Sequence, residues 1–424
     1  SRKSISAKFK KIYIYSIFHS AFKSVYKMKF TNFQIIFLLG FLTWSSLAPL
    51  YLYYGWYLRS EGISYVEIGM VLSSNVIFTF FAQLLSGFLF DRFHNYKYLL
   101  LFTFLIRSLS TSFIAYLPNP RDTYIWYVLS SFSLGMFSPL SQSIIAETSR
   151  SEKLGTNLGQ FRLSGSAGWV FSCIVSGFVA MQSLKGSFVL ASFFSILSLP
   201  LILLLKTSAN TSQNVNNLNL SKDTNNSTRQ NNLAIFLFYL SIFLASIGMG
   251  AASNFLNIFI LENGNNALSL SLILAIGALV EVPSMLLSGK LSDAVGPLKL
   301  LSVSEFFLGL VYLGYASVKD LYSFFVVQSF RGLFYSIFTV SGMHFSSIAG
   351  GEKKRGISAG VYNVANTIGL ALGPYLAGLI SQYPLFLLGS YSGISASFIF
   401  SFFISIFAAA LLLLYELLKK LLKY

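Results

Sequence analysis

The stretch Gly87-Phe88-Leu89-Phe90-Asp91-Arg92 ends a long apolar run of the chain. The stretch Gly289-Lys290-Leu291-Ser292-Asp293 ends another run 202 residues further along, and both read Gly-x-Leu-x-Asp. Four more glycines recur at an offset of 201 residues: Gly155, Gly159, Gly168 and Gly177 are matched by Gly356, Gly360, Gly369 and Gly378. Self-similarity at a fixed offset indicates repeated structural units, so two halves of about 200 residues follow one plan.

The composition is that of an integral membrane protein. Of the 424 residues, 54% are hydrophobic and only 10% are charged, whereas a soluble domain carries roughly 25% charged residues. The single cysteine, Cys173, lies within an apolar run, and the three histidines are far apart in the sequence. We therefore expect no disulfide framework, no metal site and no cofactor.

Twelve apolar runs are long enough to cross a bilayer, because about 20 helical residues span a hydrocarbon core of ~30 Å. They lie near residues 33–56, 66–90, 98–116, 123–146, 158–181, 186–205, 233–261, 267–289, 299–317, 321–348, 357–380 and 384–415. The predicted fold is an all-α membrane protein with twelve transmembrane helices in two six-helix bundles, related as 6+6 pseudo-symmetric repeats.

Two segments outside these runs are polar. Residues 1–30 carry eight Lys or Arg and no acid. They are a basic amphipathic segment on anionic lipid, an unstructured positive tail, or a stretch that precedes a native start at Met28. Residues 207–232 are rich in Asn, Ser and Thr, which predicts a disordered linker. It separates an N-terminal bundle (31–206) from a C-terminal bundle (233–424).

The distribution of basic residues predicts the orientation. With both termini on one side, that side holds 24 of the 30 Lys and Arg, and the opposite loops hold four: Arg59, Arg121, Lys185 and Lys319. Cytoplasmic loops carry the excess of basic residues, so we expect cytoplasmic termini and linker in a plasma-membrane protein. This distribution accounts for the net charge of +16, so nucleic acid is not an expected partner. The lipid bilayer is an expected partner, and we expect the protein to be a monomer.

Twelve spans in 6+6 form, a long central inner loop and Gly-x-Leu-x-Asp after the second and eighth spans together resemble the major facilitator superfamily of secondary transporters. The family's loop motif runs Gly-x-Leu-x-Asp-Arg/Lys-x-Gly-Arg/Lys-Arg/Lys. The first copy keeps Gly87, Leu89, Asp91 and Arg92 but has His94 where glycine is expected. The second keeps Gly289, Leu291, Asp293 and Gly296 but has Ala294 where a base is expected. The resemblance covers nearly the whole chain except the tail and linker.

The motif has a physical interpretation as a gate latch. Asp91 ends a predicted helix, where the helix's own carbonyl groups repel a carboxylate. We expect Asp91, with Arg92 beside it, to bind the start of the eleventh span when the cytoplasmic side is closed. Asp293 is expected to bind the start of the fifth span less strongly. Gly87 and Gly289 permit close helix approach. The alternative is a pair of solvated loop acids.

Four ionisable residues lie within spans: Arg107, Glu281, Glu305 and Arg331. Each costs at least ~2.5 kcal/mol near the bilayer centre unless it is paired or hydrated. The resemblance implies that the tenth span lines the cavity, so Arg331 is a predicted substrate or coupling residue. Glu281, in apolar surroundings and followed by Pro283, is the predicted proton site. The alternative for Glu281 is a static ion pair with Arg331.

The other charges have plainer interpretations. Arg107 is expected to be a structural tie within the N-terminal bundle, with an anion contact as the alternative. Glu305 is expected to form an internal structural pair or to anchor the inner interface, with a functional role as the alternative. Arg162, near the start of the fifth span, is expected to reach the membrane surface with its long side chain.

The resemblance also implies that the first, fourth, seventh and tenth spans line a central cavity. On these spans Trp44, Gln142, Asn254 and Asn257 are the predicted solute contacts. Asn254 and Asn257 are three residues apart, so they share a helix face. Aromatic and amide groups with few charges suit a sugar- or nucleoside-like solute. Such residues also pack helices in any membrane bundle, which is the alternative.

These observations predict a secondary active transporter that works by alternating access, coupled to protons as a symporter of a small organic solute. A proton-coupled drug or metabolite exporter is the first alternative. A non-transporting receptor or a lipid scramblase on the same scaffold is the second. The chain has no Walker-type Gly-Lys-Ser/Thr loop, so ATP is not the expected energy source. We expect no enzymatic activity, because no nucleophile–base or metal-ligand spacing occurs.

Overall fold

The computed structural model describes residues 31–92, 96–148, 154–205, 232–318, 320–349, 351–383 and 393–421. Twelve α-helices lie in these ranges, with one short 3₁₀ turn, η1 (Pro120–Thr123), and no strand. The helices are α2 (Asn32–Ser60), α3 (Tyr65–Arg92), α4 (Tyr96–Tyr116), α5 (Tyr124–Thr148), α6 (Leu154–Gln182), α7 (Leu184–Leu203), α8 (Asn232–Glu262), α9 (Ala267–Val295), α10 (Pro297–Ser317), α11 (Leu321–Ala349), α12 (Gly351–Gln382) and α13 (Ile394–Leu421).

Each of the twelve is long and apolar enough to span a bilayer. The predicted all-α, twelve-span fold is therefore confirmed. The predicted end of the eighth span at 289 is six residues short, because α9 continues through its Pro283 to Val295. Residues 1–30 and the greater part of the predicted linker lie outside the described residues, as do residues 384–392 at the predicted start of the last span.

Local sequence signals set the helix ends. Thr31 caps α2 with a reciprocal capping box, in which its side chain accepts from the Gln34 amide and the Gln34 side chain accepts from the Thr31 amide. This arrangement satisfies two donors that a helix start would otherwise leave unpaired. Between α9 and α10, Gly296 adopts a φ of +96° and Pro297 begins the next helix. Only glycine takes that backbone conformation readily, so the turn is tight and sharply placed.

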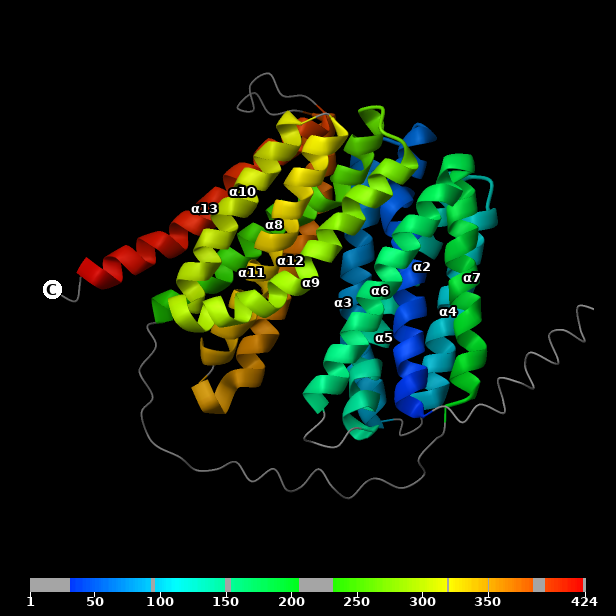
Figure 1. Ribbon diagram of the computed structural model, residues 1–424, viewed down its shortest axis with the longest axis horizontal. Coiled ribbons are helices and arrows are strands. Elements are labelled where there is room, and N and C mark those ends of the chain that lie inside the picture. Colours follow the sequence, from blue (N-terminus) through cyan, green and yellow to red (C-terminus); the bar gives the residue numbers. More distant parts are fainter. Residues whose placement is uncertain are drawn as a thin grey trace, which may run out of the picture.

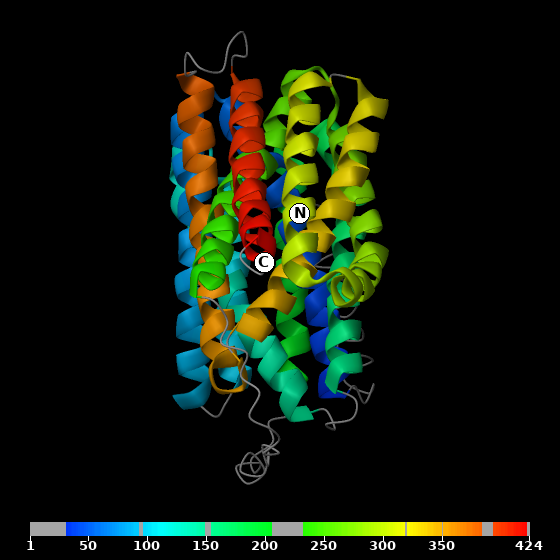
Figure 2. The ribbon, with the colours of Figure 1, turned by 90° about the vertical axis from the view of Figure 1, so that its left-hand side faces the viewer.

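The helices form two halves, α2–α7 and α8–α13, which lie side by side in Figure 1. Turned by 90°, the helices of both halves run along one common direction (Figure 2). Between the halves, α3 packs on α12 and α6 packs on α9, while α2 meets α8. Because α3 corresponds to α9 and α12 to α6 in the sequence repeat, the first two interfaces are equivalent. The repeat is therefore a pseudo-two-fold relation in three dimensions.

The two ends of the bundle differ in which helices end there. The contact end is where α2, α6, α8 and α12 end and α3 and α9 begin. The motif end is the opposite one, where α3 and α9 end with the Gly-x-Leu-x-Asp stretches. In Figure 1 the two halves meet at the contact end, at the top, and diverge toward the motif end.

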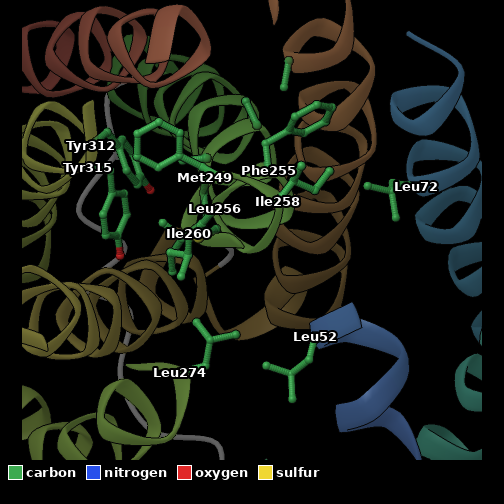
Figure 3. Packing of buried hydrophobic residues seen from close by; sticks show 14 of the residues in the cluster. Leu52, Leu72, Met249, Phe255, Leu256, Ile258, Ile260, Leu274, Tyr312 and Tyr315 are labelled. Atoms are coloured by element: carbon green, nitrogen blue, oxygen red, sulfur yellow. The ribbon is translucent and has the colours of Figure 1, made fainter. Parts of the chain in front are cut away.

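The largest buried apolar cluster joins the two halves. Figure 3 shows side chains of α8, among them Phe255 and Ile258, between Leu52 and Leu72 of the first half and Tyr312 and Tyr315 of α10. Aromatic side chains of this size bury about 150–250 Å² each. In a bilayer such contacts stabilise through close packing rather than through water exclusion. The cluster therefore fixes the position of α8 against both the first half and α10.

Candidate functional site

Hydrogen bonds and one ion pair join the halves at the contact end. Arg59 at the end of α2 donates from Nε to Oε1 of Glu262 at the end of α8, over 2.9 Å. The Tyr65 hydroxyl on α3 donates to the same carboxylate over 2.7 Å, and the Arg59 guanidinium lies 4.1 Å from the Tyr65 ring centroid. The backbone amide of Tyr65 also donates to the Gln382 side chain of α12. Helix ends from both halves thus share one polar cluster.

The backbones also approach closely there. A methyl group on Gly69 of α3 would lie 2.4 Å from the carbonyl oxygen of Pro374, and one on Gly378 of α12 would lie 2.4 Å from the carbonyl oxygen of Tyr65. At the equivalent crossing of α6 and α9, a methyl group on Gly177 would lie 2.8 Å from the hydroxyl oxygen of Ser271. Small residues are therefore required at these crossings, as is usual where membrane helices touch.

At the motif end the corresponding glycines have no such neighbours among the described residues. A methyl group on Gly87, Gly159, Gly289 or Gly360 would meet no atom within 4 Å. Each lies 18 residues from a residue of the tight crossings at the contact end: Gly69, Gly177, Ser271 and Gly378. Eighteen residues are about five helical turns, so each pair lies on one helix face some 27 Å apart. The same faces therefore touch at one end and stand apart at the other.

A cavity of about 210 Å³ lies between the halves. Its wall comes from α2, α3 and α5 on one side and from α8, α11 and α12 on the other. The lining residues are Leu47, Leu50, Tyr51, Asn75, Val76, Tyr127, Ser130, Ser131, Leu134, Met249, Ser253, Asn254, Arg331, Tyr335 and Leu370. Apolar walls with a few polar groups are typical of a site for a small organic molecule.

Arg331 is the one charged residue in the wall of this cavity, as far as the described residues show. Its Nη1 lies 3.5 Å from Oε2 of Glu281 on α9, and both side chains are 21% exposed. The guanidinium also lies 4.5 Å from the ring centroid of Tyr335, one turn further along α11. The structure thus brings the two predicted coupling residues together as an ion pair. Its separation is longer than the ~2.7–2.9 Å of a tight charge-assisted hydrogen bond.

The two asparagines on α8 have different surroundings. Asn254 lines the cavity and donates to the Gly250 carbonyl of its own helix. Asn257 is 3% exposed and donates to the carbonyl oxygen of Tyr51 on α2, over 2.7 Å, while its Oδ1 has no partner among the described residues. One turn of α8 therefore supplies a cavity contact and an inter-half contact.

Trp44 and Gln142 do not line the cavity. Trp44 lies against Gly165 of α6 and forms an edge-to-face contact with Trp169. Gln142 is exposed and donates to Ser138 on its own helix over 3.4 Å. Both belong to helices that line the cavity, but they lie nearer its motif end.

Arg107 and Glu305 lie inside the two halves rather than between them. Arg107 is 2% exposed and donates to the carbonyl oxygens of Thr43 on α2 and Ser130 on α5. Glu305 is fully buried on α10, where its Oε1 accepts from Ser241 of α8 over 2.5 Å. The Arg107 Nε and the Glu305 Oε2 have no hydrogen-bond partner among the described residues. Each side chain thus ties helices of one half together.

The motif residues are only partly described. The side chain of Asp91 lies outside the described part of the structure, whereas Arg92 is exposed at the end of α3. Asp293 is 78% exposed, with Oδ1 at 3.8 Å from Nδ1 of His344 on α11. His344 Nδ1 also forms a hydrogen bond of 2.8 Å with Ser292. Asp293 therefore faces a neighbour in its own half, and no ion pair joins it to α6 among the described residues.

Sequence reasoning missed several residues of this site. Three of them carry no charge, and nothing in the sequence distinguishes them from residues that only pack helices together: Tyr51, Asn75 and Tyr335. The sequence repeat could have predicted the Arg59–Glu262 pair, because the two residues lie at the ends of equivalent spans, 203 residues apart. Tyr51 and Ser253, which form an inter-half hydrogen bond, lie 202 apart. Equivalent positions on α2 and α8 thus meet near the pseudo-two-fold axis.

Comparisons with known proteins agree with this architecture. The chain is 28% identical over 176 residues to an uncharacterized MFS-type transporter of Methanocaldococcus jannaschii, a match that spans 41% of this chain and 43% of that relative. The fold resembles a crystal structure of a mutant of the nucleoside transporter NupG, with a TM-score of 0.72 at 17% identity over 90% of this chain and 98% of that one.

A bacterial homolog of the human lysosomal transporter Spinster, in an inward-facing and occupied conformation, also matches with a TM-score of 0.72, at 13% identity over 91% of this chain and 96% of that one. The family model of the Major Facilitator Superfamily matches residues 35–374 and 238–421. It thus covers nearly all of the described helices, and the repeat, the twelve spans and the cavity between the halves fit it. The chain is a multi-pass membrane protein of the Major Facilitator Superfamily.

Proposed function

We propose that this protein is a secondary active transporter that moves a small polar organic solute by alternating access, as a proton-coupled symporter. The observation that carries the proposal is the cavity between the two halves. Among the described residues, the matching helix faces of these halves touch at the contact end and stand apart at the motif end. A solute bound there contacts both halves. When the motif end closes and the contact end opens, the cavity becomes accessible from the other side of the membrane, and the solute can leave there.

The paired glycines supply the geometry for that exchange. In the described state α3 meets α12 at Gly69 and Gly378, whereas Gly87 and Gly360 are uncovered. Rocking the halves brings the second pair together on the same helix faces, because about five turns separate the two contact points. The α6–α9 interface repeats the arrangement. Two equivalent sets of small residues thus serve as alternative closing points.

The motif acids act in the closed state of the motif end. Asp91, with Arg92 beside it, binds the N-terminus of α12, and Asp293 binds that of α6, where unpaired backbone amides favour an anion. In the described state Asp293 instead lies beside His344 in its own half. Its exposure supports the proposal, since a latch residue must be free when the gate it closes is open.

Glu281 and Arg331 form the coupling pair. When Glu281 is ionised it holds the Arg331 guanidinium, and when Glu281 is protonated Arg331 is released to the solute. The pair separation of 3.5 Å and the partial exposure of both side chains support a contact that can be exchanged. Once Glu281 is protonated, the Arg331 guanidinium lacks its charged partner, so oxygen atoms of the bound solute take the place of the carboxylate.

The solute is sugar- or nucleoside-like. Asn75, Asn254 and the serines of α5 offer hydrogen bonds to hydroxyl groups, and Tyr51, Tyr127 and Tyr335 offer ring faces. The fold likeness to a nucleoside transporter supports this class. Asn257 acts through its contact with Tyr51, while Trp44 and Gln142 act at the motif-end approach to the cavity.

The motif end is cytoplasmic, and the protein acts as a monomer in the plasma membrane. The excess of Lys and Arg on that side supports the orientation. The described state is then inward-facing. Transport uses no ATP and makes or breaks no covalent bond of the solute, so the protein is not an enzyme.

Uptake into proteoliposomes tests the function directly. Purified protein is reconstituted and offered a panel of labelled sugars, nucleosides and organic acids, with and without an inward proton gradient. Accumulation above equilibrium with the gradient supports symport. Accumulation only with the opposite gradient supports an exporter. Lack of flux for every solute contradicts transport and favours a receptor, and flux of labelled phospholipid favours a scramblase.

A further inference from the structure

Tyr51 of α2 bonds to the opposite half through both its side chain and its backbone. Its hydroxyl donates over 3.4 Å to the carbonyl oxygen of Ser253 on α8. Its own carbonyl oxygen accepts over 2.7 Å from the side chain of Asn257, one turn further along α8. One residue of the first half thus carries two hydrogen bonds to the same helix of the second half. Both bonds lie nearer the contact end than the motif end of these helices.

The bond between Tyr51 and Ser253 lies in the wall of the cavity, because both residues line it. Within the described part of the chain, it is the one hydrogen bond that joins wall residues of different halves. Arg331, by contrast, pairs with Glu281 of its own half, so rocking one half as a unit does not by itself separate that pair. The Tyr51–Ser253 bond is therefore the polar contact of the wall that such a movement makes or breaks.

The hydroxyl of Tyr51 is held loosely, whereas the rest of the residue is held in place. The 3.4 Å bond to Ser253 is longer than the ~2.5–3.0 Å of an ordinary O–H···O hydrogen bond. The ring makes an edge contact with Trp169 of α6, with centroids 5.4 Å apart. The backbone is bonded to Asn257, whose side chain is 3% exposed. A solute oxygen can therefore replace the Ser253 carbonyl as the acceptor without displacing the ring.

The Ser253 carbonyl and a solute oxygen compete for one donor, because a tyrosine hydroxyl carries a single proton. In the described state the contact end is closed, so a solute that accepts from Tyr51 breaks the bond to Ser253. When the contact end opens, α2 moves away from α8 there and leaves the hydroxyl free for the solute. A ligand shifts a conformational equilibrium by its difference in affinity for the two states. The solute therefore favours the state in which Tyr51 has no protein acceptor.

We propose that the Tyr51 hydroxyl is the donor of a solute subsite, and that the Ser253 carbonyl displaces the solute from it when the contact end closes. This inference rests on the proposed transport function. The solute presents an acceptor oxygen to the subsite, as a hydroxyl group of a sugar or nucleoside does. It is bound more tightly while the contact end is open and more weakly once that end has closed, which favours its release at the motif end. One hydrogen bond corresponds to a roughly two- to tenfold difference in affinity.

The first test uses the empty protein and needs no solute. Spin labels at Ser60 and Asn263, in a Cys173→Ala background, report the distance between α2 and α8 at the contact end. Tyr51→Phe removes the hydroxyl and keeps the ring, so the population with an open contact end should rise roughly two- to tenfold. Unchanged populations in Tyr51→Phe would show that the Ser253 carbonyl is no competitor for the solute.

Tyr54→Phe is the matched control for this measurement. Tyr54 lies on the same helix, and its hydroxyl forms a 2.9 Å hydrogen bond with Thr123 of its own half. The control thus removes one hydrogen bond of a tyrosine on α2 without touching the contact between the halves. It should leave the distance distribution unchanged. Retained folding of both variants is checked by their melting temperatures in detergent.

The second test identifies the solute oxygen that Tyr51 binds. The probes are labelled uridine, adenosine, glucose and xylose, each with analogues that lack one hydroxyl group. For a probe that is taken up into proteoliposomes, Tyr51→Phe should raise the half-saturating concentration roughly two- to tenfold, and Tyr54→Phe should leave it unchanged. One of the analogues should be weakened to the same extent with the unsubstituted protein. It should be weakened no further by Tyr51→Phe, because both changes remove the same hydrogen bond.

The outcomes separate this inference from the function beneath it. If Tyr51→Phe and the loss of each solute hydroxyl weaken uptake additively, the solute does not accept from Tyr51, and the subsite is wrong while transport stands. If other solutes cross the membrane and all four probes are excluded, a sugar or nucleoside hydroxyl is not the acceptor. Uptake of no solute at all contradicts the transport function itself, whereas the populations of the empty protein still decide whether Tyr51 holds the contact end.

Discussion

Arg59 in the last turn of α2 and Glu262 at the end of α8 form a 2.9 Å ion pair, although 203 residues separate them in the chain. The pair stands where equivalent helices of the two halves end. A carboxylate at a helix C-terminus is disfavoured by the carbonyl groups of its own helix, whereas a cation is favoured there. Arg59 thus offsets the unfavourable position of Glu262, and the two halves are held together as a result.

Removing this pair should open the contact end. With about a third of each side chain exposed, such a pair contributes about 0.5–1 kcal/mol, which corresponds to a roughly two- to fivefold population shift. Glu262→Gln should therefore increase the long-distance population between spin labels at Ser60 and Asn263 in a Cys173→Ala background. Glu67→Gln is the matched control, because the Glu67–Arg121 pair lies within one half. An unchanged distance distribution in Glu262→Gln would show that the pair does not hold the contact end.

The two glycines of α3 should respond oppositely to substitution. Gly69→Ala places a methyl group 2.4 Å from the Pro374 carbonyl oxygen, an overpacked contact that costs about 1–3 kcal/mol. We expect the contact end to open in the same spin-label measurement. Gly87→Leu meets open space in the described state, so it should leave this state populated, raise its share and slow transport.

A neighbouring residue supplies the control for Gly87→Leu. Phe88 is 59% exposed on the same turn of α3, and Phe88→Leu should leave both distances and transport rate unchanged. If Gly69→Ala and Gly87→Leu shift the distance distribution in the same direction, the proposal of alternative closing points is wrong.

Neutralising Glu281 should uncouple transport from protons. Glu281→Gln removes the carboxylate that we propose exchanges a proton, while keeping the shape of the side chain, so solute accumulation driven by a proton gradient should be lost. Exchange of labelled for unlabelled solute across the membrane needs no net proton movement and should persist. Glu61→Gln, at an exposed position of the contact end, should preserve both activities. Gradient-driven accumulation by Glu281→Gln would rule out Glu281 as the proton site.

Arg107 should contribute to stability by filling space as well as by its charge. It is among the largest fully buried side chains, so Arg107→Ala leaves a void and should destabilise the fold by about 2–4 kcal/mol. Arg107→Met keeps much of the volume and removes a buried cation that has no carboxylate partner among the described residues, which offsets the lost hydrogen bonds. Melting in detergent should therefore be lowered by Arg107→Ala and nearly unchanged by Arg107→Met. Equal losses in both variants would show that the charge itself stabilises the fold.

Much of the fold was predictable because bilayer thickness fixes helix length and composition. The runs around Gly87 and Gly289 correspond to α3 and α9, and the offsets of 201 and 202 residues recur as equivalent interfaces in space. Charges were found for the same reason, since Arg331 and Glu281 stand out in an apolar background. Tyr51 and Asn75 could not be found this way. Uncharged polar residues occur on every helix, and the sequence does not say which helix face turns toward the cavity.

The sequence alone determined the twelve spans, the two-fold repeat and the residues of the Gly-x-Leu-x-Asp stretches, because hydrophobic length and residue spacing are local properties of the chain. Only the tertiary structure decided that Arg331 pairs with Glu281, that Arg59 meets Glu262, and that Gly69 is covered while Gly87 is open. These contacts depend on the tilt of one half against the other. That tilt is set by packing between residues hundreds of positions apart, which no local pattern in the sequence records.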